Sequence, residues 1–204
     1  MKNRYMSFMT ASALAASVLL ALPAFAALNQ GAKAPDFTAE ASLAGKDFSF
    51  SLQNALKKGP VVVYFYPAAY TGGCDIEAHT FATQKASFDK AGATIIGVSA
   101  DSILRLNTFS SDPNYCAGKF PVASDADGRI AASYGLKLQP AEPGATDVRG
   151  HAIDHGFIPR TTFVIGRDGK IIAAFSSEAD HLHPQDHVTK SLAIVQHLQA
   201  GAAP

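Results

Sequence analysis

Long apolar runs alternate along the chain with segments whose apolar residues recur every three or four positions, which is the pattern of an α/β protein. The run at 61–66, VVVYFY, is β-branched or aromatic throughout and predicts a central strand covered on both faces. A second buried strand is predicted at 94–99. Two further runs, at 161–165 and 170–175, flank Gly166-Arg167-Asp168-Gly169, whose Asp-Gly pair favours a tight hairpin turn.

Helical spacing of apolar residues lies between and after these strands. It predicts helices at 75–90, at 127–134, where Gly135 ends the segment, and at 187–199. The order strand, helix, strand, helix, hairpin, helix predicts a thioredoxin-like α/β fold, with a central mixed sheet flanked by helices. Residues 138–159 contain several prolines and glycines and predict a long loop, either a functional lid or a mobile connection.

The N-terminus has the order of features that a secretory signal peptide shows. Lys2 and Arg4 precede an apolar run at 11–22, and Ala24-Phe25-Ala26 ends the segment. We therefore expect residues 1–26 to be a signal peptide cleaved between Ala26 and Ala27, one domain over 27–204, and export to a periplasm. A membrane anchor is the alternative, but the run is shorter than the roughly 20 apolar residues of a span.

Composition narrows the range of partners. The chain carries 17 Lys and Arg against 17 Asp and Glu, and without Lys2 and Arg4 its net charge is near −2. No basic run stands out, so a nucleic-acid partner is not expected. No later stretch is apolar enough to cross a bilayer, so no membrane partner is expected either. The two cysteines, Cys74 and Cys116, could form a plain structural disulfide in an oxidising compartment.

Cys74 occupies a position that favours reactivity. It follows the central predicted strand and lies where the helix at 75–90 begins, so unpaired backbone N–H groups and the positive end of the helix dipole are expected beside its sulfur. We expect this setting to lower the pKa of the thiol from about 8.5 by one unit or more and to favour the reactive thiolate. Gly72 and Gly73 permit an unusual backbone path just before it.

Three neighbours complete the candidate site. Thr71 carries a hydroxyl that can orient a peroxide, although it could instead be only a helix N-cap. Arg160 directly precedes the strand at 161–165 and could hold the sulfur anionic, although it could be only a surface charge. Pro67 stiffens the loop, but prolines end many strands.

The spacing P-x-x-x-T-x-x-C, formed by Pro67, Thr71 and Cys74, resembles the active-site signature of peroxiredoxins. The resemblance covers most of the chain after residue 26. It extends to the segments 34–37, 91–101, 120–128 and 159–165 and to Glu77, three residues after the cysteine, and it is strongest for the peroxiredoxin Q (bacterioferritin comigratory protein) type.

The resemblance implies a thiol-dependent peroxidase that acts in antioxidant defence. Cys74 would be the peroxidatic cysteine, oxidised by hydrogen peroxide or an organic hydroperoxide to a sulfenic acid. Thr71 and Arg160 would position the peroxide and stabilise the transition state, and Pro67 would shield the sulfur from water. The implied partners are the peroxide and a thiol reductant, either a thioredoxin-like protein or a small thiol, and the implied state is a monomer.

One feature of peroxiredoxin Q is missing. Many members carry a second cysteine five residues after the first, where this chain has His79, which we expect to face solvent. Cys116 is the other candidate for a resolving cysteine. It lies in the segment 110–118, which contains Pro, Asn and Gly and is expected to be exposed and mobile. A static disulfide and a one-cysteine mechanism with an external thiol are the alternatives.

Other functions remain as alternatives. Histidines gather at His181, His183 and His187 and at His151 and His155, but no ligand set of a known spacing forms, so exposed histidines and no metal or other cofactor are expected. A thiol–disulfide oxidoreductase of the same fold would need a C-x-x-C pair, which is absent. A redox-sensing module with a structural disulfide would require neither Thr71 nor Arg160.

Overall fold

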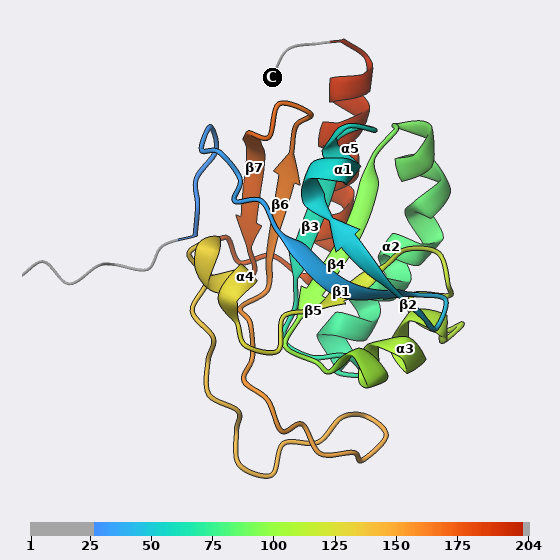
Figure 1. Cartoon of the computed structure of the whole chain (residues 1–204), viewed down its shortest axis with the longest axis vertical. Coiled ribbons are helices and arrows are strands. Elements are labelled where there is room, and N and C mark those ends of the chain that lie inside the picture. Colours follow the sequence, from blue (N-terminus) through green and yellow to red (C-terminus); the bar gives the residue numbers. More distant parts are fainter. Residues whose placement is uncertain (1–26, 202–204) are drawn as a thin grey trace, which may run out of the picture.

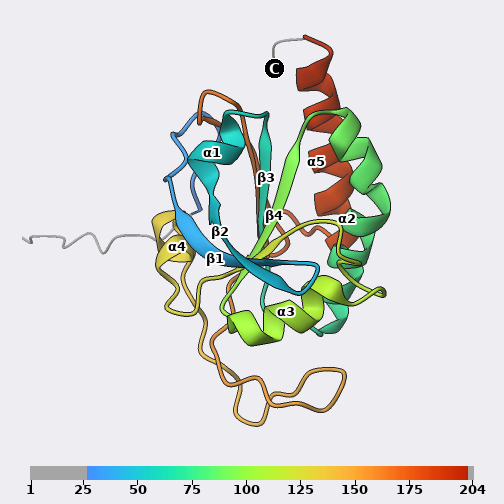
Figure 2. The same ribbon diagram turned by 45° about the vertical axis from the view of Figure 1, so that its right-hand side comes forward.

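The computed structural model describes residues 27–201, and the predicted signal peptide at 1–26 lies outside them. One mixed sheet of seven strands forms the centre, in the order β2-β1-β5-β4-β3-β6-β7, with helices on both faces (Figures 1 and 2). The strands are β1 (Thr38–Leu43), β2 (Lys46–Ser51), β3 (Val61–Phe65), β4 (Thr94–Ser99), β5 (Val122–Ser124), β6 (Thr161–Ile165) and β7 (Ile171–Ser176). The helices are α1 (Leu52–Leu56), α2 (Gly72–Lys90), α3 (Ile103–Ser111), α4 (Arg129–Ser133) and α5 (Pro184–Gln199).

Strand β3 divides the core into two layers. All five of its residues are buried, and successive side chains point to opposite faces of the sheet. Val61, Val63 and Phe65 pack with the layer that includes α1 and α4. Val62 and Tyr64 pack with the layer that includes α2, α3 and α5. Strand β3 pairs in parallel with β4 and antiparallel with β6, so the chain after β3 and the chain before β6 meet at one edge of the sheet.

The α/β class, the thioredoxin-like arrangement, both central strands and the hairpin of β6 and β7 are confirmed. Two helices begin earlier than the sequence predicts. Helix α2 begins at Gly72, and α5 begins at Pro184, because proline suits the first turn of a helix, where no backbone donor is needed. Helix α4 is shorter than predicted, at Arg129–Ser133.

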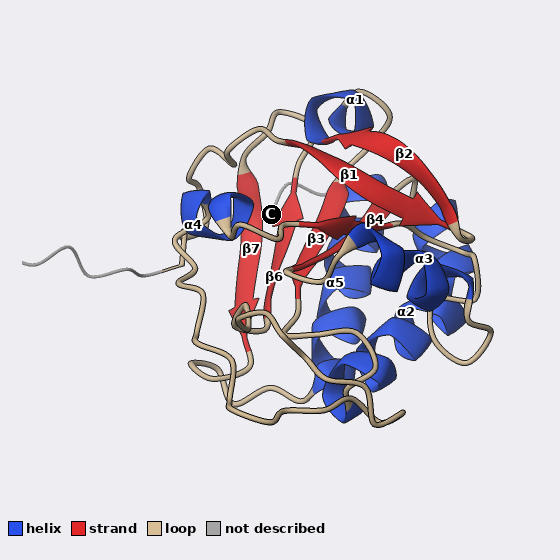
Figure 3. Cartoon of the chain, turned by 60° about the horizontal axis from the view of Figure 1, so that its bottom comes forward, coloured by secondary structure: helices blue, strands red, loops and turns tan. Residues whose placement is uncertain are grey.

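Several elements were not predicted. They are β1, β2, α1, α3 and β5. β2 is an edge strand that leaves most of its residues exposed, and β1 is rich in small residues, so neither shows a long apolar run. The segment 138–159 is a loop, as predicted, with only the isolated bridges Gln139↔Phe157 and Thr146↔Ala152 (Figure 3). No helix within residues 27–201 is long and apolar enough to cross a membrane.

Candidate active site

Cys74 is the third residue of α2, which follows β3 through the loop 66–71. Its side chain is 2% exposed. The first-turn position that the sequence predicts is confirmed, so the positive end of the helix dipole faces the sulfur. The thiol therefore lies in a nearly dry site beside unpaired backbone donors.

Arg160 lies against the Cys74 sulfur. Its Nη2 donates to Sγ at 3.2 Å, and its Nη1 donates to Glu77 Oε2. The sheet explains this contact, because Phe65 pairs with Thr161 and the residue before β6 therefore emerges beside the loop that follows β3. The side chain of Arg160 is 10% exposed, so the alternative that it is only a surface charge is wrong.

Thr71 and Pro67 belong to the loop that leads to the cysteine. Thr71 is the N-cap residue of α2, but its hydroxyl makes no capping bond and instead donates to the carbonyl of Ala68 at 2.8 Å. This bond closes the turn that precedes the helix. Pro67 is half-buried at the start of the loop.

The expected lowering of the Cys74 pKa is wrong for this conformation. Burial raises the pKa of the Cys74 thiol, while the charge of Arg160, the hydroxyl of Thr71 and the backbone of Ala68 each lower it. The cost of placing a charge in an apolar site exceeds these three favourable contributions. Arg160 is the largest of the three, so it is the group on which ionisation of Cys74 chiefly depends.

Glu77 is part of the site, although the sequence indicated it only through the family resemblance. Its carboxylate is fully buried, with Oε2 bonded to Arg160 and Oε1 without a partner. Burial raises the pKa of Glu77 to about 7, against the effect of Arg160. The spacing from Cys74, three positions along one helix, places both side chains on the same face and could have indicated the pair.

Cys116 is fully buried and a free thiol, so the expectation of an exposed, mobile segment is wrong. Backbone bonds from Ala117 to Asp112 and from Gly118 to Ser110 close the segment on itself. His79, which is exposed as expected, bonds through Nδ1 to the carbonyl of Asn114 at 2.9 Å and ties the segment to α2. The segment 110–118 is therefore a turn, as its residue types indicate, but it is closed and its cysteine is buried.

The two cysteines have opposite electrostatic surroundings within one apolar cluster. Cys74 faces the cation of Arg160. Burial raises the pKa of Cys116 well above its usual value, and the carboxylates of Asp112 and Asp75 raise it further. In this conformation, Cys74 is accordingly the better placed of the two sulfurs to ionise.

Within residues 27–201 no group of three or more His, Cys, Asp or Glu side chains could hold an ion. The expectation that the histidines are exposed is wrong for His187, which is fully buried and bonds to Thr162 Oγ1 at 3.0 Å and Ser177 Oγ at 2.9 Å. It is also wrong for His155, whose side chain is only 14% exposed. Ser177 in turn donates its backbone N–H to the carbonyl of Arg160, so His187 supports the strand ends that carry the arginine.

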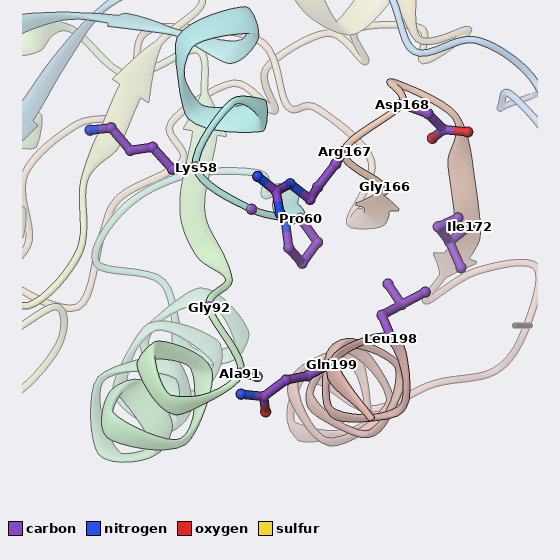
Figure 4. A pocket seen from close by; sticks show the side chains of 11 residues that line it. Lys58, Pro60, Ala91, Gly92, Gly166, Arg167, Asp168, Ile172, Leu198 and Gln199 are labelled. Atoms are coloured by element: carbon purple, nitrogen blue, oxygen red, sulfur yellow. The ribbon is translucent and has the colours of Figure 1, made fainter. Parts of the chain in front are cut away.

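A surface pocket of about 600 Å³ lies at the opposite end of the sheet (Figure 4). Lys58, Pro60, Arg167, Ile172 and Leu198 are among the residues that line it. It includes none of the candidate catalytic residues. The pocket is therefore separate from the candidate active site.

A thioredoxin-like fold with a buried cysteine at the start of the helix after its central strand, beside an arginine, defines the class of thiol-dependent peroxidases. Comparison with known families agrees, since the AhpC/TSA family matches residues 30–174. The chain belongs to the AhpC/TSA family.

The relatives are peroxiredoxins. A Mycobacterium tuberculosis (strain H37Rv) protein whose name assigns it provisionally to the peroxiredoxins is 34% identical over 146 residues, 72% of this chain and 84% of the relative. The chloroplastic peroxiredoxin Q of Populus jackii is 30% identical and matches 85% of this chain and 71% of that protein. The crystal structure of peroxidoxin BcpB from Mycobacterium tuberculosis has a TM-score of 0.68 at 29% identity and covers 84% of this chain and 98% of that one.

The buried His187 should make the stability of the protein depend on pH. Burial and then the charge of Arg160 lower the pKa of His187 to about 4, from 6.5. The unfolded chain therefore takes up a proton at this residue at a higher pH than the folded chain. We expect about 3 kcal/mol of stability to be present above pH 6.5 and to be lost as the pH falls towards 4.

Urea unfolding at pH 7 and pH 4.5 measures this difference. The variant His187→Gln removes the titrating group, and His197→Gln removes an exposed histidine of the same helix as a control. The wild type and the control should lose more stability between the two pH values than His187→Gln does. An equal loss in all three proteins would contradict the prediction.

Proposed function

We propose that Cys74 is the peroxidatic cysteine of this thiol-dependent peroxidase. The observation that carries the proposal is the contact of 3.2 Å between Arg160 Nη2 and Cys74 Sγ at the first turn of α2. The guanidinium offers a fixed positive charge and several donors to an anion in a site with little water. Although burial raises the pKa of Cys74, the guanidinium favours both its thiolate and the negative charge that would develop on a peroxide oxygen.

The reaction requires no cofactor. The thiolate of Cys74 attacks one peroxide oxygen, an S–O bond forms and the O–O bond breaks. The other oxygen leaves as hydroxide or alkoxide and takes up a proton, so sulfur is oxidised to a sulfenic acid while the peroxide is reduced to water or an alcohol. Arg160 would stabilise the leaving oxygen, the hydroxyl of Thr71 would orient the peroxide, and Pro67 would limit access of water.

The substrate class proposed is hydrogen peroxide together with organic hydroperoxides. A solved Xanthomonas campestris bacterioferritin comigratory protein, 27% identical with a TM-score of 0.60, is described by its alkyl peroxide reduction activity and supports the second part. A thioredoxin-like protein or a small thiol would act as the reductant, and the enzyme would work as a monomer, as the likeness to peroxiredoxin Q suggests.

Cys116 is proposed as the resolving thiol. It would attack the sulfenic sulfur, form a disulfide with Cys74 and release water. A disulfide needs Cα atoms within about 7 Å. Cys116 is buried, and Asp112 and Asp75 disfavour its ionisation. Opening of its turn and of the start of α2 would therefore precede the attack.

Rapid-mixing experiments with the two single cysteine variants test these roles. We expect Cys74→Ser to lose fast consumption of hydrogen peroxide, because the attacking sulfur is gone, while Cys116→Ser keeps the first step. Cys116→Ser should then accumulate a sulfenic acid that dimedone traps, detected by mass spectrometry. Oxidation of Cys74→Ser at the wild-type rate would refute the peroxidatic role, and disulfide-free turnover of the wild type would refute resolution by Cys116.

The pH dependence of the first step tests the role of Arg160. Because only the thiolate attacks and burial raises the pKa of Cys74, the rate should increase with pH through that pKa. Arg160→Met removes the largest contribution that lowers the pKa, so the profile should move to higher pH and the rate at pH 7 should fall by about 100-fold or more. Arg167→Met, an exposed arginine near the opposite end of the sheet, is the control. A profile for Arg160→Met that matches the control would contradict the proposal.

Export to a periplasm is also proposed, and the order of positive charge, apolar run and Ala24-Phe25-Ala26 supports it. Expression of the full chain in a Gram-negative host should yield a periplasmic protein whose N-terminal residue is Ala27. The variant Ala26→Lys should block cleavage and leave a longer chain with the membrane fraction. Recovery of uncleaved wild-type protein in the cytoplasm would refute export.

A further inference from the structure

The long loop 138–159 is attached to the loop that precedes the active cysteine. It extends away from the sheet in both ribbon views (Figures 1 and 2). Its residue Val148 nevertheless donates its backbone N–H to the carbonyl of Tyr70 at 2.9 Å. The guanidinium of Arg149 lies over the ring of Tyr70, 3.2 Å from its centroid. The loop therefore reaches back to within a few residues of Cys74.

Two charged side chains hold the peptide groups of Ala69. Asp101 Oδ2 accepts the N–H of Ala69 at 2.8 Å, and Arg105 Nη2 donates to its carbonyl at 3.0 Å. Asp101 is fully buried and also accepts from Ser99 Oγ at 2.7 Å. Its Oδ1 lies 2.9 Å from both Arg105 Nε and His155 Nε2. Hydrogen bonds and ion pairs that are shielded from water are stronger than exposed ones, so they hold this loop firmly.

Asp147 joins the long loop to this group. Its Oδ2 accepts from Arg105 Nη2 at 2.9 Å and from Arg149 Nη2 at 2.7 Å. Its Oδ1 accepts the backbone N–H groups of Arg149 and His151. The side chain of Asp147 is fully buried. One arginine, Arg105, therefore connects the long loop, Asp101 after the end of β4, and the loop before Cys74.

The residues that are held in this way have an unfavourable backbone. Tyr70 has a φ of 61°, in the left-handed region that a bulky side chain rarely adopts. Neighbouring contacts are needed to maintain such a conformation. The next residue, Thr71, bonds to Ala68, and both of these lower the pKa of Cys74. A shift of the turn 68–70 would alter the surroundings of the sulfur directly.

The geometry points to Arg105 and Asp147 as positioning residues for the peroxidatic cysteine, acting through the turn Ala68–Tyr70. The inference rests on the proposed role of Cys74. It assigns to the loop 138–159 the function of a clamp that keeps this turn in its reactive form. Arg105 suits the task because its planar guanidinium donates to Ala69 and Asp147 while Nε lies beside Asp101, an arrangement that the compact ammonium group of a lysine does not reproduce.

The test measures formation of the Cys74 thiolate against pH and the rate of oxidation by hydrogen peroxide. Arg105→Met removes the cation at similar volume, and Asp147→Asn removes the charge with little change of shape. Both variants should raise the pH at which half of Cys74 is ionised and should slow oxidation at pH 7 by about tenfold or more. Arg105→Lys should recover less than half of the loss.

Arg129→Met is the matched control. Arg129 is the first residue of α4 and forms an exposed ion pair with Asp127, so the variant also removes one arginine from an ion pair. It should behave as the wild type. If Arg105→Met fails to fold, Asp147→Asn provides the test, since it preserves the size of the buried side chain. A wild-type ionisation midpoint in a folded variant of either residue would overturn the inference. Cys74→Ser separates this inference from the proposed function. If that variant were oxidised by hydrogen peroxide as fast as the wild type, the proposed function itself would be refuted.

Discussion

The site depends on a buried cation, Arg160, held between a thiol and a carboxylate. Removing a guanidinium from water costs several kcal/mol unless opposite charge and hydrogen bonds compensate for it. Glu77 supplies the charge, and the Cys74 sulfur accepts a further bond. The neutral state of His187 is part of the same balance, since the arginine disfavours a second positive charge nearby. The reactivity proposed for Cys74 would therefore depend on the way in which the fold keeps Arg160 in place.

The sheet creates this arrangement from segments that are far apart in the sequence. Strand β3 directs its C-terminal end toward the loop that carries Thr71 and Cys74. Its parallel neighbour β4 brings Asp101 to the same edge, and its antiparallel neighbour β6 brings Arg160 there at its beginning. Both charged groups then bear on one short turn, Asp101 through the backbone of Ala69 and Arg160 through the sulfur. A mixed sheet therefore does what an all-parallel one could not, because a residue that precedes a strand reaches the edge where other strands end.

The sequence was most informative where burial is continuous. The runs of β3 and β4 are apolar on both faces and could be recognised directly, as could the Asp-Gly hairpin. Strand β2 could not, because an edge strand with exposed residues has no such run, and β1 could not, because its residues are mostly small. The partnership of Arg160 with Cys74 was predictable from chemistry and strand order. The burial of Cys116 was not, because Pro, Asn and Gly indicate a turn but do not reveal whether aromatic residues cover it.

The long-range ion pairs were also beyond the reach of the sequence. Arg105 and Asp147 are separated by 42 positions and belong to a helix and a loop whose relative placement depends on the whole fold. Neither lies in a spacing that indicates a contact. The ionisation of Asp147 also depends on the fold. Burial opposes it, but hydrogen bonds from Arg149 and from the backbone of His151 lower the pKa of Asp147 to about 2. Because its pKa is about 2, the carboxylate of Asp147 stays ionised near neutral pH and can pair there with Arg105.

The two sulfurs lie in one apolar cluster, and their charged neighbours differ in whether they favour ionisation of the sulfur. The cation beside Cys74 favours ionisation of that sulfur, while burial and then the nearby carboxylates disfavour ionisation of Cys116 as long as its turn stays closed. In the proposed mechanism, oxidation of Cys74 would remove the thiolate that Arg160 favours, so their contact would weaken when a second sulfur is needed. Cys116 would then leave its acidic neighbours through the opening of its own turn. On this proposal, the closed state would suit attack on the peroxide, and formation of the disulfide would require the packing of the same cluster to loosen.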